Sequence, residues 1–200
     1  MGHRLLGVFY PGPKTENHAS RRARREPALA SNENTFYFSS MDVTTARLVA
    51  VEEIQRLKYR YLRTLDLKRW DEFADTLAPD ATADYGSQVG QGPLRFTGRD
   101  AIVGYMSGAI GPDITTVHVC HHPEITVDGD TAEATWCLED TVLATGFGTM
   151  IRGAAYYSDR YRRDDGVWRI VHTGYTRLYE AVIPFDALPG LRLTTPPHAG

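Results

Sequence analysis

The hydrophobic pattern divides the chain at about residue 41. Residues 1–40 mix Pro, Gly, Asn and Ser around a run of arginines and show no sustained helical or alternating period of apolar residues. From Met41 onward the apolar positions become periodic, and after residue 183 Pro and Gly break the pattern again. We therefore expect a disordered extension over residues 1–40, one folded domain over residues 41–183 and an irregular tail over residues 184–200.

The first part of the patterned region predicts helices. Apolar residues recur every three or four positions along one stretch, which predicts a long amphipathic helix ending near Asp66. The residues of this apolar stripe are Val51, Ile54, Leu57, Tyr61, Leu62 and Leu65. Shorter helices are expected over residues 70–77 and 99–107, separated by a short strand over 81–85 and a glycine-rich loop over 86–98.

The second half predicts strands. Four long segments rich in β-branched and aromatic residues are separated by short turns that contain glycine, which is typical of hairpins and therefore of an antiparallel sheet. These segments are residues 115–127, 131–147, 150–163 and 167–182. Helices followed by strands indicate an α+β fold. We expect a cone-shaped, curved antiparallel sheet packed on the long N-terminal helix and two shorter helices, with a small-molecule pocket between them.

Composition and charge narrow the classes of function. The 200 residues are 42% hydrophobic and 24% charged, which is typical of a globular protein. The net charge is −3: residues 1–40 hold six basic and three acidic residues, a charge of +3, which leaves −6 for the remainder. A body with net negative charge is not expected to bind nucleic acid.

Motifs for metals, cofactors and membranes are missing from the sequence. Cys120 and Cys137 lack the spacing of a zinc or redox site and are too few for a disulfide framework, so we expect a cytoplasmic protein. His118, His121 and His122 have no recognised metal-ligand spacing, and no metal is expected. No phosphate loop, dinucleotide fingerprint, GxSxG motif or long apolar segment occurs, so neither a cofactor nor a membrane span is expected.

Three polar residues stand out from the pattern, and such breaks are typical of functional sites. Asp140 interrupts the alternating apolar row that includes Trp136 and Val142, and a buried carboxylate must be paired or functional. Asp66 lies in the last turn of the long helix, where the helix dipole opposes an acid. His118 sits among apolar strand residues, and histidine side chains exchange protons near neutral pH.

Further residues complete a candidate set. Tyr61 lies on the apolar stripe of the helix, while Tyr175, Arg177 and Tyr179 are expected to share one face of the last strand. Arg177 is the expected partner of Asp140. Taken singly, these residues also fit structural roles such as a core histidine or an ion pair. Together they can move a proton and stabilise an enolate or a leaving hydroxyl without metal.

Several segments resemble the SnoaL-like group of the nuclear transport factor 2-like superfamily. The resemblance covers residues 45–182 and rests on Tyr61 to Asp71 (YLRTLDLKRWD), Asp84-Tyr85, His118 and residues 123–129 (PEITVDG). It implies the conical α+β fold. The group includes polyketide cyclases, dehydratases and isomerases, so it also implies an enzyme.

Four segments are similar to the bile acid 7α-dehydratase family. They are HHPEIT from His121, WCLED from Trp136, RGAAYYSDRY from Arg152 and TGYTRLYE from Thr173. The catalytic set of that family is a tyrosine and an aspartate on the first helix, a histidine and an aspartate on strands, and an arginine on the last strand. The positions that match it here are Tyr61, Asp66, His118, Asp140 and Arg177.

Scytalone dehydratases are less similar. Asp66, Tyr85 and His118 fit their pattern, but Val142 and Tyr157 stand near the positions of their second histidine and their asparagine. That specific activity is therefore not expected. The tyrosines expected to contact the substrate are Tyr85, Tyr157 and Tyr175.

The resemblance implies a cofactor-independent dehydratase that removes water from a hydroxylated, steroid-like enone. His118 would be the general base, and Asp66 would orient it. Tyr61 would bind the enolate oxygen or assist proton transfer, and Asp140, held by Arg177, would position or protonate the departing hydroxyl; these roles could be exchanged within the set. The implied partners are a hydrophobic polycyclic substrate, free or as a CoA ester, and further copies of the chain in a dimer or trimer. Two alternatives stay open: a polyketide or terpenoid cyclase or double-bond isomerase of the same fold, and a non-catalytic ligand-binding module.

Overall fold

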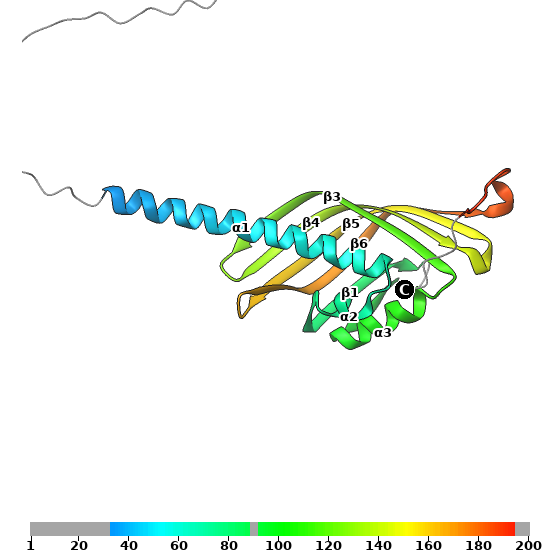
Figure 1. Ribbon diagram of the computed structural model, residues 1–200, viewed down its shortest axis with the longest axis horizontal. Coiled ribbons are helices and arrows are strands. Elements are labelled where there is room, and N and C mark those ends of the chain that lie inside the picture. Colours follow the sequence, from blue (N-terminus) through cyan, green and yellow to red (C-terminus); the bar gives the residue numbers. More distant parts are fainter. Residues whose placement is uncertain (1–32, 89–91, 195–200) are drawn as a thin grey trace, which may run out of the picture.

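A curved sheet with a long helix across its concave face forms the body of the protein (Figure 1). The computed structural model describes residues 33–88 and 92–194. The helices are α1 (Glu33–Asp66), α2 (Trp70–Ala74) and α3 (Arg99–Ala109), with 3-10 turns at Thr145–Phe147 and Phe185–Ala187. The strands are β1 (Leu77–Gln88), β2 (Gly92–Thr97), β3 (Ile114–Asp128), β4 (Thr131–Ala144), β5 (Thr149–Asp164) and β6 (Val167–Pro184). The predicted α+β class and the four long strands are confirmed.

The strand order within the described residues is β2-β1-β6-β5-β4-β3. The hairpins from β3 to β6 pair antiparallel as predicted, and so do β1 and β2. The β1–β6 pair, however, is parallel, so the expectation of a wholly antiparallel sheet was wrong at this one junction. Turn residues determine the direction of consecutive strands only, and β1 and β6 are far apart in the sequence.

Helix α1 begins at Glu33, inside the stretch that was expected to be an extension. Residues 33–50 contain neither Gly nor Pro, so nothing in this segment stops the helix. Residues 42–49 are exposed, and the first turns of α1 project beyond the sheet in Figure 1. Because residues 42–49 bury no face, this part of the helix lacks the apolar period from which the helix was predicted. Residues 1–32 of the expected extension lie outside the described part.

Two further boundaries differ from the prediction. Helix α2 ends at Ala74 rather than residue 77, because Leu77 and Ala78 begin β1 and are fully buried. The expected glycine-rich loop contains the end of β1 and all of β2, which pairs with β1 through contacts such as Tyr85 opposite Leu94. At the other end of the chain, the tail expected from residue 184 starts after β6 with a 3-10 turn; residues 195–200 lie outside the described part.

The apolar stripe of α1 packs on the sheet as predicted. Ile54, Leu57, Tyr61, Leu62 and Leu65 are each at most 4% exposed. They meet sheet residues including Trp136, Leu138 and Ile170 in one core. Burying each such side chain stabilises the fold by about 1.5–3 kcal/mol, so the helix is held firmly over the concave face.

A bulge in β6 changes the face of the sheet to which the last side chains of this strand point. Ala155 pairs with Arg177 and Ala154 with Tyr179, so Leu178 is an extra residue and the alternation shifts after it. Tyr179 is 53% exposed and does not share the buried face of Tyr175 and Arg177, contrary to the prediction.

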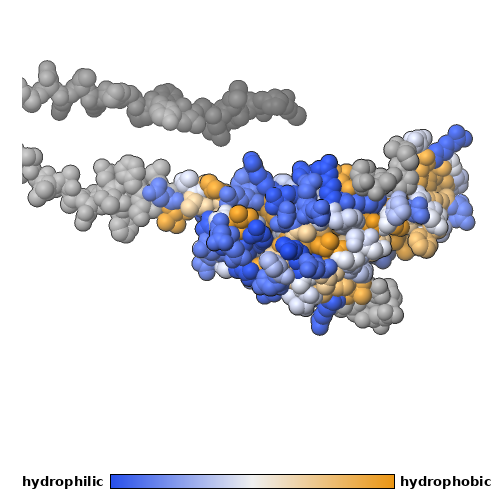
Figure 2. All heavy atoms as spheres, turned by 60° about the horizontal axis from the view of Figure 1, so that its bottom comes forward, coloured by the Kyte–Doolittle hydropathy of each residue, from blue (hydrophilic) through white to orange (hydrophobic). Residues whose placement is uncertain are grey.

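The surface is mainly hydrophilic on the face drawn in Figure 2, with hydrophobic residues gathered toward the end of the body farthest from the start of α1. Exposed apolar residues of the described chain include Phe147 and Val182. No described helix has the length and apolar character needed to cross a membrane.

Candidate active site

Asp66 and His118 form the first pair of the candidate site. Asp66 is the last residue of α1, and its Oδ1 lies 2.6 Å from Nδ1 of His118 on β3. The same carboxylate accepts hydrogen bonds from the His118 backbone N–H at 3.0 Å and from the Thr116 hydroxyl at 2.8 Å. These three donors explain why an acid is kept at a helix C-terminus. They also hold the imidazole with Nδ1–H toward the carboxylate, which leaves Nε2 free to accept a proton.

Asp140 and Arg177 form the second pair. Asp140 lies on the buried face of β4, and its two carboxylate oxygens each accept a hydrogen bond of 2.7 Å from the Arg177 guanidinium. Burial alone would lower the pKa of Arg177, but the hydrogen bonds and charge of Asp140 keep this pKa above its usual value. The predicted pairing is therefore present, and it is a bidentate, charge-assisted one.

The two pairs lie side by side on the sheet. His118 of β3 stands directly opposite Asp140 of β4 in the antiparallel ladder. Opposite residues point to the same face, with Cβ atoms about 4.5–5.5 Å apart. The register therefore brings Asp66, His118, Asp140 and Arg177 into one row.

Tyr61 of α1 and Tyr85 of β1 form a hydrogen-bonded pair. Their hydroxyl oxygens are 2.8 Å apart, and both side chains are buried. Burial raises the pKa of Tyr61 and of Tyr85 well above the usual 10.0. Both phenols are therefore neutral, and a hydrogen-bonded pair of hydroxyls has one proton left to donate to a third oxygen.

Tyr175 connects the tyrosines to the ion pair. Its ring centroid lies 6.2 Å from that of Tyr85 and 5.5 Å from that of Tyr157, and the Arg177 guanidinium carbon lies 4.9 Å from it. Tyr157 is only 3% exposed. All eight residues predicted for the site thus lie in one contiguous group, six on the sheet and two, Tyr61 and Asp66, on α1.

A second buried ion pair was not predicted from the sequence. Lys58 Nζ lies 2.7 Å from Asp159 Oδ2, and both side chains are completely buried. Lys58 Nζ also lies 3.3 Å from the centroid of the Tyr157 ring. Lys58 stands on the apolar stripe of α1, and Asp159 interrupts the row of Tyr157 and Tyr161 on β5, so both break the pattern in the way that identified Asp140.

Gly153 was also missed, and it makes room for the second pair. A Cβ atom there would lie 2.5 Å from a terminal nitrogen of Arg177, 2.8 Å from Asp140 Oδ1 and 3.1 Å from the Tyr179 carbonyl oxygen. Gly153 is the residue opposite Asp140 on β5. A glycine inside a strand is a sequence signal for a close approach of this kind.

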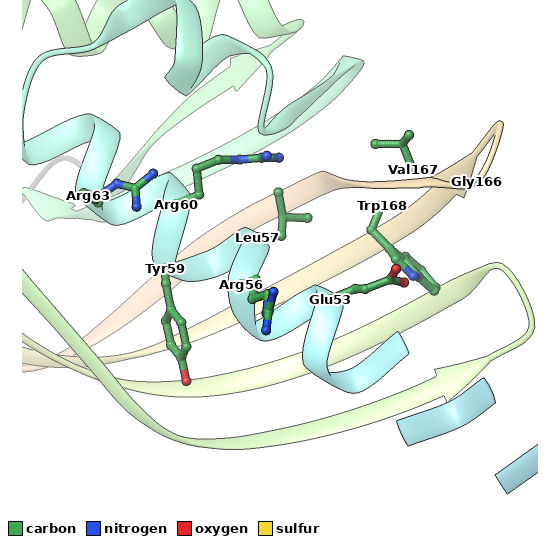
Figure 3. Close-up of a pocket in the computed structure, with 9 residues that line it drawn as sticks. All are labelled: Glu53, Arg56, Leu57, Tyr59, Arg60, Arg63, Gly166, Val167 and Trp168. Atoms are coloured by element: carbon green, nitrogen blue, oxygen red, sulfur yellow. The ribbon is translucent and has the colours of Figure 1, made fainter. Parts of the chain in front are cut away.

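Two surface cavities border α1. One of about 440 Å³ reaches the Asp66–His118 pair and is lined also by Tyr59, Arg63 and Cys120. The other, of about 660 Å³, lies between α1 and the β5–β6 turn and contains none of the predicted site residues (Figure 3). The first cavity is bordered by Asp66 and His118 and by none of the other six predicted site residues.

Comparison with known proteins agrees with this architecture. The sequence profile of the SnoaL-like domain matches residues 46–174. An uncharacterized protein of Mycobacterium tuberculosis H37Rv is 27% identical over 133 residues, which cover 66% of this chain and 87% of the relative.

Solved structures are similar at lower identity. A scytalone dehydratase-like protein from Novosphingobium aromaticivorans has a TM-score of 0.62 at 20% identity, over 75% of this chain and 99% of the other. A hexachlorocyclohexane dehydrochlorinase from Novosphingobium barchaimii has a TM-score of 0.62 at 20% identity, over 75% and 97%. At these identities the likeness establishes the fold.

Proposed function

The chain belongs to the SnoaL-like domain family, and from this premise we propose that it is a cofactor-independent hydro-lyase. The observation that carries the proposal is the row in which the Asp66–His118 pair stands beside the Asp140–Arg177 pair. One pair can take a proton and the other can bind a leaving oxygen, which are the two requirements of a 1,2- or vinylogous elimination.

His118 begins the reaction as the general base. Its Nδ1–H is held by Asp66, so Nε2 takes the proton of a C–H bond that a conjugated ketone has made acidic. Asp66 fixes the tautomer and stabilises the imidazolium that forms. A positioned base of this kind contributes a factor of about 10²–10⁴ in rate.

The remaining residues stabilise the negative charge that develops on the enolate oxygen and on the departing oxygen. The free hydroxyl proton of the Tyr61–Tyr85 pair binds the enolate oxygen. As the enolate reforms the ketone, the C–O bond breaks. The Arg177 guanidinium, which Asp140 holds in place, donates hydrogen bonds to the departing oxygen. The imidazolium of His118 returns its proton to that oxygen, so water leaves and the base is regenerated.

We propose a steroid-like, hydroxylated enone as the substrate, free or as a CoA ester. The aromatic side chains of Tyr85, Tyr157 and Tyr175 support a flat, apolar ring system. The motif similarity to the bile acid 7α-dehydratase family supports the same class. A neighbour of the same fold is named a dehydrochlorinase, which also carries out an elimination.

The direct test is incubation of the full chain with a 7-hydroxy-3-oxo-Δ4 steroid. Dehydration extends the conjugation, so we expect the absorbance of the dienone to rise. His118→Ala is expected to lower kcat by about 100-fold or more. His172→Asn is the matched control, because His172 lies on β6 and bonds Thr82 through Nδ1, a contact that asparagine can copy.

The outcome distinguishes the proposal from its alternatives. Absence of dienone with the native chain, together with a shifted double bond or a closed ring, would assign an isomerase or cyclase. Binding without any product, unaffected by His118→Ala, would assign a ligand-binding module.

A further inference from the structure

Three side chains of the types that can bind metal ions meet on the outer face of the sheet, opposite the candidate active site. His121 of β3 stands directly opposite Cys137 of β4, and a bulge between His121 and Glu124 turns His122 back toward them. His122 has φ of +51°, which is an uncommon backbone conformation for a residue other than glycine. Strand alternation puts His118 and Cys120 on the inner face, so the cluster is separate from the proposed catalytic residues.

Small changes in the distances within the cluster would accommodate a tetrahedral ion. The Nδ1 atoms of His121 and His122 are 2.7 Å apart, and one ligand atom from each of these histidines and Sγ of Cys137 all lie within 4.8 Å of one another. Zinc bonds of about 2.0–2.1 Å to nitrogen and 2.3 Å to sulfur require ligand separations of about 3.3–3.6 Å. Small side-chain rotations would satisfy these values, with the ion replacing the proton that the two imidazoles share.

Glu139 lies beside His121, one of the three side chains of the cluster. Its Oε1 lies 3.9 Å from Nε2 of His121, the nitrogen that remains free when Nδ1 binds a metal. A carboxylate facing the second nitrogen of a histidine ligand orients the ring and strengthens metal binding. Cys137 is a free, half-buried thiol.

We propose that His121, His122 and Cys137 bind a zinc-class divalent cation, with the fourth position open to water. Two imidazoles and one thiolate are the ligand types that this class prefers. His118, His121 and His122 show no ligand spacing in the sequence, because the third ligand, Cys137, comes from the neighbouring strand. The site is independent of the proposed dehydration.

Zinc binding to the full chain tests the site directly. In equilibrium dialysis against Zn²⁺ alone, we expect one tightly bound zinc per chain, and binding about tenfold weaker or worse for Cys137→Ser and His122→Ala. Glu139→Gln is expected to weaken binding about tenfold. Cys120→Ser is the matched control: it removes the other thiol, on the inner face, and should bind zinc as the native chain does. Native-like affinity in Cys137→Ser, or no bound zinc in the native chain, would overturn the proposal.

Two measurements on the native chain avoid any effect of substitution on folding. Bound Co²⁺ should show a thiolate-to-cobalt charge-transfer absorption; bound cobalt without it would exclude Cys137 as a ligand and refute the site. Zinc should also protect Cys137 from iodoacetamide, and alkylation at an unchanged rate would count equally against it. Cys120→Ser provides the reference, because Cys137 is then the only thiol that iodoacetamide can alkylate.

Discussion

At the scale of single residues, the buried Asp140 depends on Arg177 for charge compensation. The Asp140 side chain is 4% exposed and that of Arg177 13%, so water cannot replace a lost partner. We expect Arg177→Met to lower the free energy of unfolding by about 3–5 kcal/mol, because it leaves an isolated buried carboxylate. The loss is measured by urea unfolding.

The double variant provides the control for this prediction. Asp140→Asn combined with Arg177→Met removes both charges and should recover a large part of the lost stability. If the single variant is as stable as the native chain, the pair does not stabilise the fold.

Gly153 tests how tightly the same pair is packed. A methyl group at this position would overlap Arg177 and Asp140, which are fixed by their two hydrogen bonds. We expect Gly153→Ala to lower the free energy of unfolding by about 1–3 kcal/mol and to reduce dienone formation. Both are measured on one preparation, by urea unfolding and by the absorbance assay.

Gly104 provides the matched control for Gly153. It lies within α3, and a Cβ there meets nothing within 4 Å. Gly104→Ala should therefore leave the activity unchanged and raise the stability by up to about 1 kcal/mol. Equal behaviour of the two variants would show that Gly153 has no special packing role.

The residue scale is where the sequence was most informative about the site. Asp140 and His118 could be found because each puts a polar group on an apolar strand face, and burial of such a group requires a partner. Lys58 and Asp159 gave the same signal. They were missed because lysine on a helix stripe is usually a solvated side chain, and because their pairing joins two distant elements.

At the scale of elements, the Asp66 carboxylate ties the end of α1 to β3. It accepts three hydrogen bonds from Thr116 and His118. Asp66→Ala leaves these donors unpaired, and we expect a loss of about 1–3 kcal/mol in unfolding free energy together with most of the activity. Urea unfolding and the dienone assay give both quantities.

Thr116→Val is the partner experiment for this connection. It removes one hydrogen bond to Asp66 and keeps the shape and the His118 contact, so we expect a loss of about 1 kcal/mol and retention of most activity. If Thr116→Val abolishes activity as completely as Asp66→Ala, the orientation of His118 does not depend on Asp66 alone.

The elements also show why part of the topology could not be predicted. The turns after residues 128 and 164 determine the hairpins, but the bulge between His121 and Glu124 shifts the β3–β4 register by one residue, and only this shift brings His118 opposite Asp140. No local signal specifies that β1 lies parallel to β6, since the two strands are far apart in the sequence and no turn joins them. β2 pairs antiparallel with β1, the strand that precedes it, and the glycines of this segment made it resemble a loop in the sequence.

At the scale of the whole molecule, the core contains four tyrosines whose ionisation is coupled to folding. They are Tyr61, Tyr85, Tyr157 and Tyr161, and burial raises the pKa of each well above 10.0. Below pH 10 these phenols are neutral in both states, so the stability is unaffected. Above pH 10 the unfolded chain releases protons that the folded chain retains, so the unfolding free energy must fall as the pH rises.

Each buried tyrosine contributes up to about 1.4 kcal/mol per pH unit to this slope. Urea unfolding at a series of pH values on both sides of 10 measures the slope, and tyrosinate absorbance should appear together with loss of the fold. Tyr85→Phe removes one ionising group and should make the slope shallower by that amount. A slope that the substitution leaves unchanged would mean that Tyr85 ionises inside the folded protein, and the hydroxyl pair would then not be a neutral donor at alkaline pH.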